Sequence, residues 1–365
     1  MTRLYLRPTG FVDAPFGHDG QVLRLAGGLA WFSMIELIRV ADGRRVEQRL
    51  VPVDRIDAAI AALPSDERMQ AEAVLARLVA ARPALVLGER TIRLDQPQVM
   101  AILNVTPDSF SDGGAHAGDP AAAADAGVAM AAAGAALLDV GGESTRPGAK
   151  PVWEGDESAR VRPVIERLAR AGVAVAIDTR KAAVMEAALA AGAGIVNDVS
   201  ALLWDARSAG VVAAAGCPVI LMHHRGDPQT MQDRPHYDDV LIEVYDWLAA
   251  RIAAAVAAGI DRARILIDPG IGFGKSVAHN LALLNGLSLF HGLGCPLLLG
   301  ASRKRFIGAL SNEAAVDRRL GGSLAVAMTG VCQGVQIVRV HDVAETVQAL
   351  KIWRGLRDEA LTPRG

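Results

Sequence analysis

Short apolar runs recur along the chain from about residue 98 to residue 340. The runs are Val99–Leu103, Ala136–Val140, Ala174–Ile177, Gly194–Val196, Val219–Met222, Ile265–Ile267, Leu297–Leu299 and Val335–Val340. Each run is continuous and does not alternate between apolar and polar residues, which is typical of parallel strands buried on both faces. The pattern therefore predicts eight buried parallel strands.

The segments between these runs carry a helical rhythm. Apolar residues at 241, 244, 248 and 252 repeat at the spacing of one buried helix face, and those at 343, 347 and 350 do the same near the end of the chain. Eight strand–helix units in succession match a (β/α)8 TIM barrel in count and length. We therefore expect an α/β protein built on such a barrel.

The first 84 residues have a different pattern. Trp31–Val40 and Val46–Val51 flank the dipeptide Asp42–Gly43, an arrangement that predicts a β-hairpin. The pair Pro64–Ser65 then predicts the start of a helix that runs to about Ala81. These signals indicate a small N-terminal α+β extension.

The patterns divide the chain into an accessory region at residues 1–84, a barrel at 85–358 and a C-terminal tail at 359–365. The accessory region could serve sheet pairing, dimer contacts or capping of the barrel. Hydrophobic residues make up 51% of the 365, enough for a large core. A formal net charge of −2 gives no bulk attraction to nucleic acid or to a membrane surface.

The cysteines and the lengths of the apolar runs indicate in which cellular compartment the protein resides. Cys217 and Cys295 each precede a proline and an apolar run, so we expect buried thiols. The N-terminus lacks the apolar core of a signal peptide. The run Val211–Met222 contains Pro218 and is too short to span a bilayer. These features predict a soluble, cytoplasmic protein.

Polar residues that can bind ligands stand at the ends of the apolar runs. Strand-ending carboxylates and amides occur at Asn104, Asp178, Asn197 and Asp268. TIM-barrel enzymes build their sites from loops at the carboxyl ends of the strands, often with an anion site after the last two. Here Ser302–Lys304 follows the seventh run, and Arg339 and His341 close the eighth. The positions predict an active site with a cationic wall.

Seven motifs occur in an order and spacing that together point to one family. They are Met100–Gly114, Asp139–Gly148, Ile177–Lys181, Asn197–Asp198, Asp268–Lys275, Ser302–Lys304 and Arg339–Asp342. Together they resemble the dihydropteroate synthases over roughly residues 85 to 355. The resemblance implies a transferase of folate biosynthesis that joins (7,8-dihydropterin-6-yl)methyl diphosphate to 4-aminobenzoate. It also implies Mg²⁺ as cofactor and a homodimer.

The resemblance assigns the pterin to three strand-end residues. A pterin's amino-pyrimidinone edge presents adjacent N–H donors, which a carboxylate can accept in pairs. By resemblance this edge meets Asp178, Asn197 and Asp268. His224 stands where relatives often carry methionine on the pterin floor, a departure expected to change packing and leave the reaction unchanged.

The resemblance also implies the catalytic groups. Lys304 bridges the pterin and the second substrate, while Arg339, His341 and Thr145 contact the diphosphate. With Asp178, the residues Lys304, Arg339 and His341 are the expected catalytic set. We expect C–O cleavage first, with positioning and electrostatic stabilisation supplying most of the acceleration.

The remaining assignments by resemblance concern aminobenzoate and the metal. Arg146, Pro147, Ser302 and Phe273 border the aminobenzoate pocket. Asn104 contacts Mg²⁺. This ion is coordinated mostly by substrate phosphates and water, so one protein oxygen is sufficient.

Two local patterns suggest other sites. Gly270–Ser276 is similar to a phosphate-binding loop, but Pro269 stands where that pattern needs a glycine. We interpret it as a tight loop that brings backbone and Phe273 to a ligand, with a purely structural turn as the alternative. The pair His223 and His224 lacks a third metal ligand, so we expect one of them to line the pocket.

Other polar residues have supporting roles. Arg303 is expected to brace its loop, and Asp139 and Glu143 to hold the base of the loop that follows them. Asp108 and Asp112 are either turn formers or part of a closing loop.

Two other functions fit part of the pattern. A pterin-dependent methyltransferase shares the barrel and the Asp–Asn–Asp floor, but it needs a cobalamin partner and has less use for an anion wall. A pterin-binding protein without turnover is the second possibility, and the intact cationic motifs argue against it.

Overall fold

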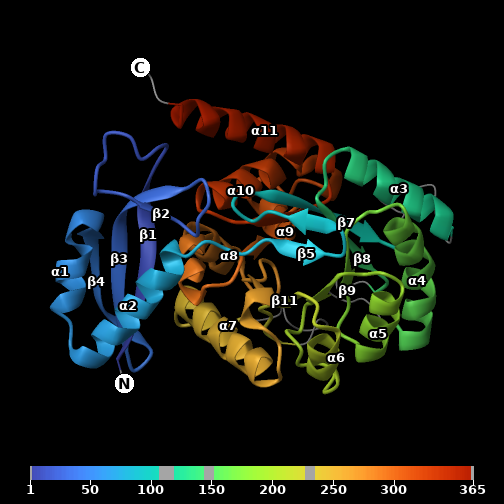
Figure 1. Ribbon diagram of the computed structural model, residues 1–365, viewed down its shortest axis with the longest axis horizontal. Helices are drawn as coiled ribbons and strands as arrows, with labels where there is room; N and C mark the ends of the chain where they lie inside the picture. The colour runs from blue at the N-terminus through green and yellow to red at the C-terminus, as the bar shows by residue number, and fades with distance from the viewer. Residues whose placement is uncertain (1, 107–118, 144–151, 227–234, 363–365) are drawn as a thin grey trace.

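The computed structural model describes residues 2–106, 119–143, 152–226 and 235–362. In it, a barrel surrounded by helices is joined to a smaller unit built on an antiparallel sheet, which lies beside the barrel (Figure 1). Thr145, Arg146 and Pro147, and also Asp108 and Asp112, lie outside the described residues.

The predicted eight parallel strands are confirmed. They are β7 (Gln98–Asn104), β8 (Leu137–Gly141), β9 (Val175–Asp178), β10 (Ile195–Asp198), β11 (Val219–Met222), β12 (Ile265–Asp268), β13 (Leu298–Leu299) and β14 (Ile337–Val340). Their order in the sheet is β12-β11-β10-β9-β8-β7-β14-β13. A parallel bridge between Ile267 and Leu297 joins the two ends, so the sheet closes into a barrel.

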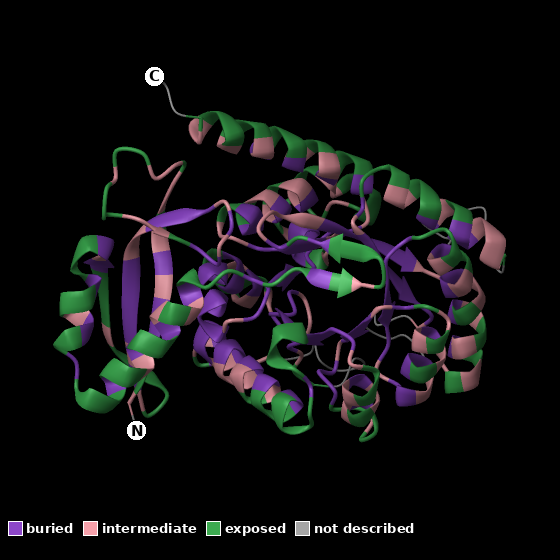
Figure 2. Ribbon diagram, viewed as in Figure 1, coloured by how far each residue is buried: buried purple, intermediate pink, exposed green. Residues whose placement is uncertain are grey.

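Helices connect the strands and form the outer ring. They are α3 (Pro120–Ala132), α4 (Glu154–Arg170), α5 (Ala182–Ala190), α6 (Ser208–Ala215), α7 (Val240–Ala257), α8 (Val277–Asn285), α9 (Arg305–Leu310), α10 (Leu320–Cys332) and α11 (Val343–Ala360). The apolar rhythms predicted α7 and α11 correctly, since Leu241, Val244, Leu248 and Ile252 are buried on one face of α7. Figure 2 shows buried faces turned inward and exposed faces outward around this ring.

The lower part of the barrel interior is a compact apolar layer. A short hairpin of β5 (Leu85–Leu87) and β6 (Arg90–Ile92) closes this end of the barrel. One cluster joins Leu85 and Ile92 of the hairpin to barrel side chains. Those barrel side chains are Met100, Leu137, Ala174, Ala176, Ile195, Ile220, Leu266, Leu298 and Ile337. This layer, called the lower layer below, leaves the opposite end for polar groups.

The N-terminal unit is a four-stranded sheet with two helices. Its elements are β1 (Arg3–Val12), β2 (Leu23–Arg24), β3 (Trp31–Ala41), β4 (Arg44–Pro52), α1 (Ile56–Ala61) and α2 (Ser65–Val79). β3 pairs antiparallel with each of the other three strands. Asp42 and Gly43 form the predicted hairpin turn, with φ angles of 51° and 76° that match a two-residue turn of type I′. The predicted helix is α2, which ends two residues early.

The unit packs against the side of the barrel. β1 lies on the 3-10 helix η4 (Leu287–Leu293), where the Ser288 hydroxyl donates a hydrogen bond to the Pro8 carbonyl at 2.7 Å. Arg45 of β4 donates to Asp239 at the start of α7 at 2.6 Å. The sheet of the unit pairs only within itself over the described residues, and the barrel end is closed by the later β5–β6 hairpin.

The other sequence expectations concern thiols and membrane spans. Cys217 and Cys295 are buried free thiols, as predicted. Among the described residues, none of the helices combines the length and the apolar character that crossing a bilayer requires.

The lower layer should dominate barrel stability. Ile220 is fully buried in it, so Ile220→Ala should lower the free energy of unfolding by about 2–5 kcal/mol through lost burial and an unfilled cavity. Urea denaturation followed by circular dichroism measures the change. Val256→Ala, at a 42% exposed position of α7, is the matched control and should change stability by less than about 0.5 kcal/mol. Equal losses for both variants would contradict this account of the core.

Candidate active site

The upper layer of the barrel interior is polar because strand side chains alternate. Residues two positions beyond a lower-layer side chain point to the same interior, one layer higher. On five strands these positions hold Asp139, Asp178, Asn197, Asp268 and Arg339. The same rule that buries an apolar layer therefore gathers charged groups at the carboxyl ends of the strands, where TIM barrels carry their sites.

Arg339 lies at the centre of this layer. Its Nε donates to Asp139 Oδ2 at 2.5 Å and its Nη2 donates to Asp178 Oδ2 at 2.8 Å. Asn197 Nδ2 donates to the same Asp139 oxygen at 2.9 Å. Charge-assisted bonds of this kind fix both carboxylates and the guanidinium in one arrangement. Arg339 is thus tied to two buried acids, and the prediction of a simple cationic wall understates its role.

Two carboxylate oxygens in this layer lack a hydrogen-bond partner within the described residues. They are Oδ1 of Asp139 and Oδ1 of Asp178, both buried. Burial and the nearby charge of Asp139 raise the pKa of Asp178 to about 7, although Arg339 opposes the shift. A buried acceptor without a partner is costly, so these oxygens are positioned to meet donors from a ligand.

Asp268 and Lys304 form the second charged group. Asp268 Oδ1 accepts a 2.7 Å hydrogen bond from the Gly270 amide, and burial raises the pKa of this carboxyl group. The Lys304 ammonium donates to the Ile271 carbonyl and lies 4.4 Å from the centroid of the Phe273 ring. Burial lowers the pKa of Lys304 to about 8. The structure therefore brings Lys304, Phe273 and Asp268 together, as the sequence predicted.

The glycine-rich loop after β12 contacts protein backbone. A Cβ atom at Gly270, where φ is +66°, would lie 1.8 Å from the His223 carbonyl oxygen. A Cβ atom at Gly272, where φ is +84°, would crowd the Lys304 stem at 3.0 Å. At Gly270 the close contact is with another loop, which agrees with the alternative of a structural turn, while the approach of the backbone and Phe273 to a ligand stays a prediction.

A buried lysine fastens the same loop. Lys275 Nζ donates to the carbonyls of Gly270 and Phe273 at 2.9 and 3.0 Å, and contacts His223 Nδ1 at 2.8 Å. Burial lowers the pKa of His223 to about 2, so this ring is neutral. His223 is therefore a structural partner of the loop.

His224 does not take part in the contact between His223 and Lys275. Its ring is 6.0 Å from that of Trp247 in an edge-on arrangement, and burial lowers its pKa. The described residues contain no group of three or more histidine, cysteine or acidic side chains that could hold a metal.

The loops after β13 and β14 are held together. Arg303 Nε donates to Asp342 Oδ2 at 3.0 Å, which confirms that Arg303 braces its loop. Ser302 Oγ lies 3.1 Å from His341 Nδ1 and accepts from the His341 amide at 3.2 Å. Two loops that follow adjacent strands thus present Ser302 and His341 side by side.

Lys181 joins the two segments that flank residues 144–151. Its Nζ donates to Glu143 Oε2 at 2.9 Å, to Glu157 Oε2 at 2.6 Å and to the Val152 carbonyl at 2.6 Å. Glu143 therefore holds the base of this loop, as expected. Asp139 does not, because its side chain points into the barrel and binds Arg339.

Three residues of this region were missed or misread from sequence. Asp139 carried a signal, since it is a lone carboxylate inside an apolar strand run, at an inward position. Lys181 and Lys275 gave no signal, because a lysine beside a loop is usually exposed and only the packing reveals that each is buried.

Removing the Lys181 ammonium should destabilise the fold. Lys181→Met leaves fully buried Glu157 without its counter-charge, which costs about 3–5 kcal/mol for a broken buried pair, while Glu143 keeps its contact with Arg180. The free energy of unfolding at pH 7 measures this loss, with Lys351→Met at an exposed helix position as the control. The double variant Lys181→Met/Glu157→Gln should recover part of the stability. A neutral Lys181→Met would contradict the assignment.

Comparisons with known proteins agree with this geometry. The family model described as pterin binding enzyme matches residues 100–341, so the N-terminal unit lies outside the match. Dihydropteroate synthase of Neisseria meningitidis serogroup B is 46% identical over 76% of this chain and 98% of its own length.

Solved structures give the same result. Xanthomonas albilineans dihydropteroate synthase with 4-aminobenzoic acid is 49% identical, with a TM-score of 0.71 over 76% of this chain and 99% of that one. The same enzyme in complex with 7,8-dihydropteroate is 46% identical, with a TM-score of 0.68 over 75% of this chain and 99% of that one. The chain therefore belongs to the pterin-binding enzymes and, within them, to the dihydropteroate synthases.

Proposed function

We propose that the upper layer of the barrel condenses (7,8-dihydropterin-6-yl)methyl diphosphate with 4-aminobenzoate, giving 7,8-dihydropteroate and diphosphate. The observation that carries this proposal is the Asp178 oxygen beside Arg339, which has no hydrogen-bond partner in the described part of the chain, with Asp268 and Lys304 on the same floor. The related enzyme from Xanthomonas albilineans, solved with 4-aminobenzoic acid and with 7,8-dihydropteroate, supports the choice of substrates.

The pterin would lie on this floor with its N–H edge toward the acids. Asp178 Oδ1 has no protein donor among the described residues, so it can accept from the ring. Asn197 is held through its amide nitrogen by Asp139 at 2.9 Å, so its amide oxygen would be the atom offered to the same edge. Asp268 Oδ1 accepts from the Gly270 amide, so Oδ2 would be the oxygen offered to the ring. Fixed acceptors of this kind select a flat, donor-rich heterocycle.

The reaction needs charge stabilisation more than proton transfer. The methylene C–O bond breaks and its electron pair leaves with the diphosphate, while the acids below offset positive charge on the pterin-methyl group. The neutral aromatic amine then forms the C–N bond and releases a proton to solvent. Arg339 and His341, with Thr145, are the residues that we assign to the departing diphosphate, and Lys304 is assigned to bridge the pterin and the second substrate.

The aminobenzoate is assigned to the rim of the site. Phe273 and Ser302 come from the loops after β12 and β13, and Lys304 lies against the Phe273 ring. We assign Arg146 and Pro147 to the same pocket by resemblance. A ring stacked near Phe273 would present its amine to the pterin methylene group, which is the positioning that a two-substrate reaction requires.

The residues present fit a bound Mg²⁺ ion. Asn104 ends β7, and a Cβ atom at Gly141 would come within 3.4 Å of Asn104 Oδ1 and 3.8 Å of Asp178 Oδ2, so two oxygens border this position. Mg²⁺ takes few protein oxygens and completes its shell with phosphates and water. When bound, the ion would neutralise charge on the diphosphate.

We also infer a cytoplasmic homodimer. The buried free thiols Cys217 and Cys295 suit a reducing compartment. Ile352 and Leu356 lie one helical turn apart on α11 and are 65% and 68% exposed, which supports a partner surface there. Sedimentation equilibrium tests the dimer, and a monomer at micromolar concentration would contradict it.

The proposed reaction should be tested with purified protein, both substrates and Mg²⁺. We expect diphosphate and dihydropteroate in equal amounts, and a loss of both when Mg²⁺ is chelated. Lys304→Ala should lower kcat/KM at least ~10²-fold, because a transition-state contact is lost. Arg305→Ala, at the exposed neighbouring position, is the control and should keep near-normal kinetics. Wild-type kinetics in Lys304→Ala would contradict the assigned site.

The raised pKa of Asp178 predicts how pterin binding depends on pH. A dihydropterin alcohol without diphosphate should bind the carboxylate form, so its affinity should rise with pH and level off above about pH 7. Below that pH it should fall by up to about tenfold per unit. Isothermal titration between pH 5.5 and about 8.5 measures this, and Asp178→Asn should abolish the dependence. Constant affinity across the range would exclude Asp178 as the titrating acceptor.

A further inference from the structure

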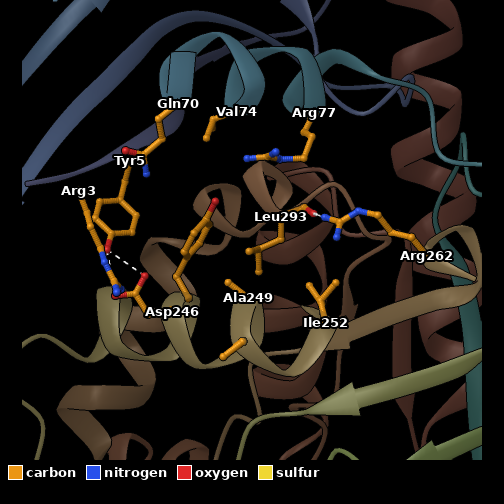
Figure 3. A pocket seen from close by; sticks show the side chains of 12 residues that line it. Arg3, Tyr5, Gln70, Val74, Arg77, Asp246, Ala249, Ile252, Arg262 and Leu293 are labelled. Atoms are coloured by element: carbon orange, nitrogen blue, oxygen red, sulfur yellow. Dashed lines mark hydrogen bonds and ion pairs between the residues drawn. The ribbon is translucent and has the colours of Figure 1, made fainter. Parts of the chain in front are cut away.

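A cavity of about 440 Å³ lies outside the helix ring, between the N-terminal unit and the barrel. Its walls come from β1, α2, α7, the turn before β12 and the end of η4 (Figure 3). The active site lies inside the barrel mouth, so this cavity is a separate feature. Its volume is in the range of pockets that bind small molecules, roughly 300–1,000 Å³.

The charged groups of the cavity are unbalanced. Arg3, Arg77 and Arg262 line it, and Asp246 is the acidic side chain among the lining residues. Asp246 is already engaged, because it accepts from Arg3 at 2.7 Å and from the Tyr5 hydroxyl at 2.9 Å. The described residues contain no ion pair for Arg77 or Arg262. Two guanidinium groups therefore face the cavity region without a carboxylate.

Three arginines converge on three consecutive backbone carbonyls at the end of η4. Arg82 donates to His291 at 3.0 Å, Arg77 to Gly292 at 2.6 Å and Arg262 to Leu293 at 2.5 Å. Capping the end of a helix explains one such contact, but carbonyls there carry only a partial negative charge. The three full positive charges of these arginines exceed that partial negative charge.

Arg82 is the buried member of this group of three arginines. Its side chain is buried, its Nε has no acceptor within the described residues, and burial together with the charge of Arg262 lowers its pKa to about 10. An anion in the adjacent cavity would relieve the repulsion among the three guanidinium groups. Tyr245 adds a donor at the same place, since burial raises its pKa to about 12 and keeps the phenol protonated.

Apart from the Gln70 amide and the two tyrosine hydroxyls, the rest of the lining is apolar. Val74 of α2, Ala249 and Ile252 of α7, and Leu293 face the cavity, as Figure 3 shows. The Tyr245 ring lies 5.3 Å from the Tyr5 ring in an edge-on arrangement. A ligand that satisfies both parts of the lining has a charged head and a compact apolar body.

We propose that this cavity is a binding site for a small organic carboxylate with an aromatic or branched apolar body. The carboxylate would lie between Arg77 and Arg262, within reach of the Tyr245 hydroxyl. The body would rest on the α7 and α2 side chains. Because both units contribute lining residues, the bound anion would strengthen the attachment of the N-terminal unit to the barrel.

Phenylacetate is a suitable probe, and its binding to the full chain can be followed by saturation-transfer NMR without either substrate. We expect saturable binding, weakened about tenfold or more in Arg77→Gln and in Arg262→Gln, because each change removes a charge-assisted contact. Arg68→Gln is the matched control: Arg68 lies on the same helix and also donates to a carbonyl, but it is exposed and does not line the cavity. It should bind like the wild type.

Two further variants keep the test decisive. Ala249→Leu fills the cavity without removing a charge and should also weaken binding, even if an arginine variant folds poorly. Lys304→Ala alters the active site and should leave binding unchanged. No saturable binding by the wild type, equal binding by all variants, or a loss confined to Lys304→Ala would overturn the proposal. None of these outcomes depends on whether the chain makes dihydropteroate.

Discussion

The arrangement of the site depends on one guanidinium group held between two buried carboxylates. Arg339 binds Asp139 at 2.5 Å and Asp178 at 2.8 Å, and Asn197 is fixed through the same Asp139 oxygen. Each partner comes from a different strand of the barrel. Removing Arg339 would leave two buried carboxylates without their guanidinium partner, which is why the group acts as a single unit.

This unit is possible because the barrel interior has two layers. The lower layer, closed by the β5–β6 hairpin, supplies apolar burial. The upper layer carries buried charges that cost free energy and leaves acceptors such as Asp178 Oδ1 without a partner among the residues that the structure describes. Apolar burial in the lower layer offsets the free-energy cost of the buried charges in the upper layer. The unsatisfied acceptors are then available to a substrate that brings N–H donors.

Sequence reasoning predicted most of the fold. Continuous apolar runs identified all eight barrel strands, because burial on both faces leaves a strong signal. It missed β1, whose Arg3, Arg7 and Pro8 interrupt any apolar run, and the strand is visible only through its pairing with β3. The site residues stood out as polar groups at strand ends, and the structure gathers those within the described residues.

The sequence alone could not predict contacts between residues that are far apart along the chain. The contact that requires a glycine at position 270 could not be predicted, because the neighbour, the His223 carbonyl, is 47 positions away in sequence. Asp139 was placed at a loop base because its inward direction depends on register. Burial of Lys181 and Lys275 likewise depends on segments distant in sequence, so no local pattern could reveal it.

The most direct measurement of the central claim is the pH midpoint of dihydropterin binding in Asp139→Asn. The charge of Asp139 helps to raise the pKa of Asp178, so its removal should move the midpoint below that of the wild type. The charge of Asp139 acts on the Asp178 carboxyl group directly, and Arg339 opposes it from between the two. A midpoint identical to that of the wild type would contradict a coupled Asp139–Arg339–Asp178 unit.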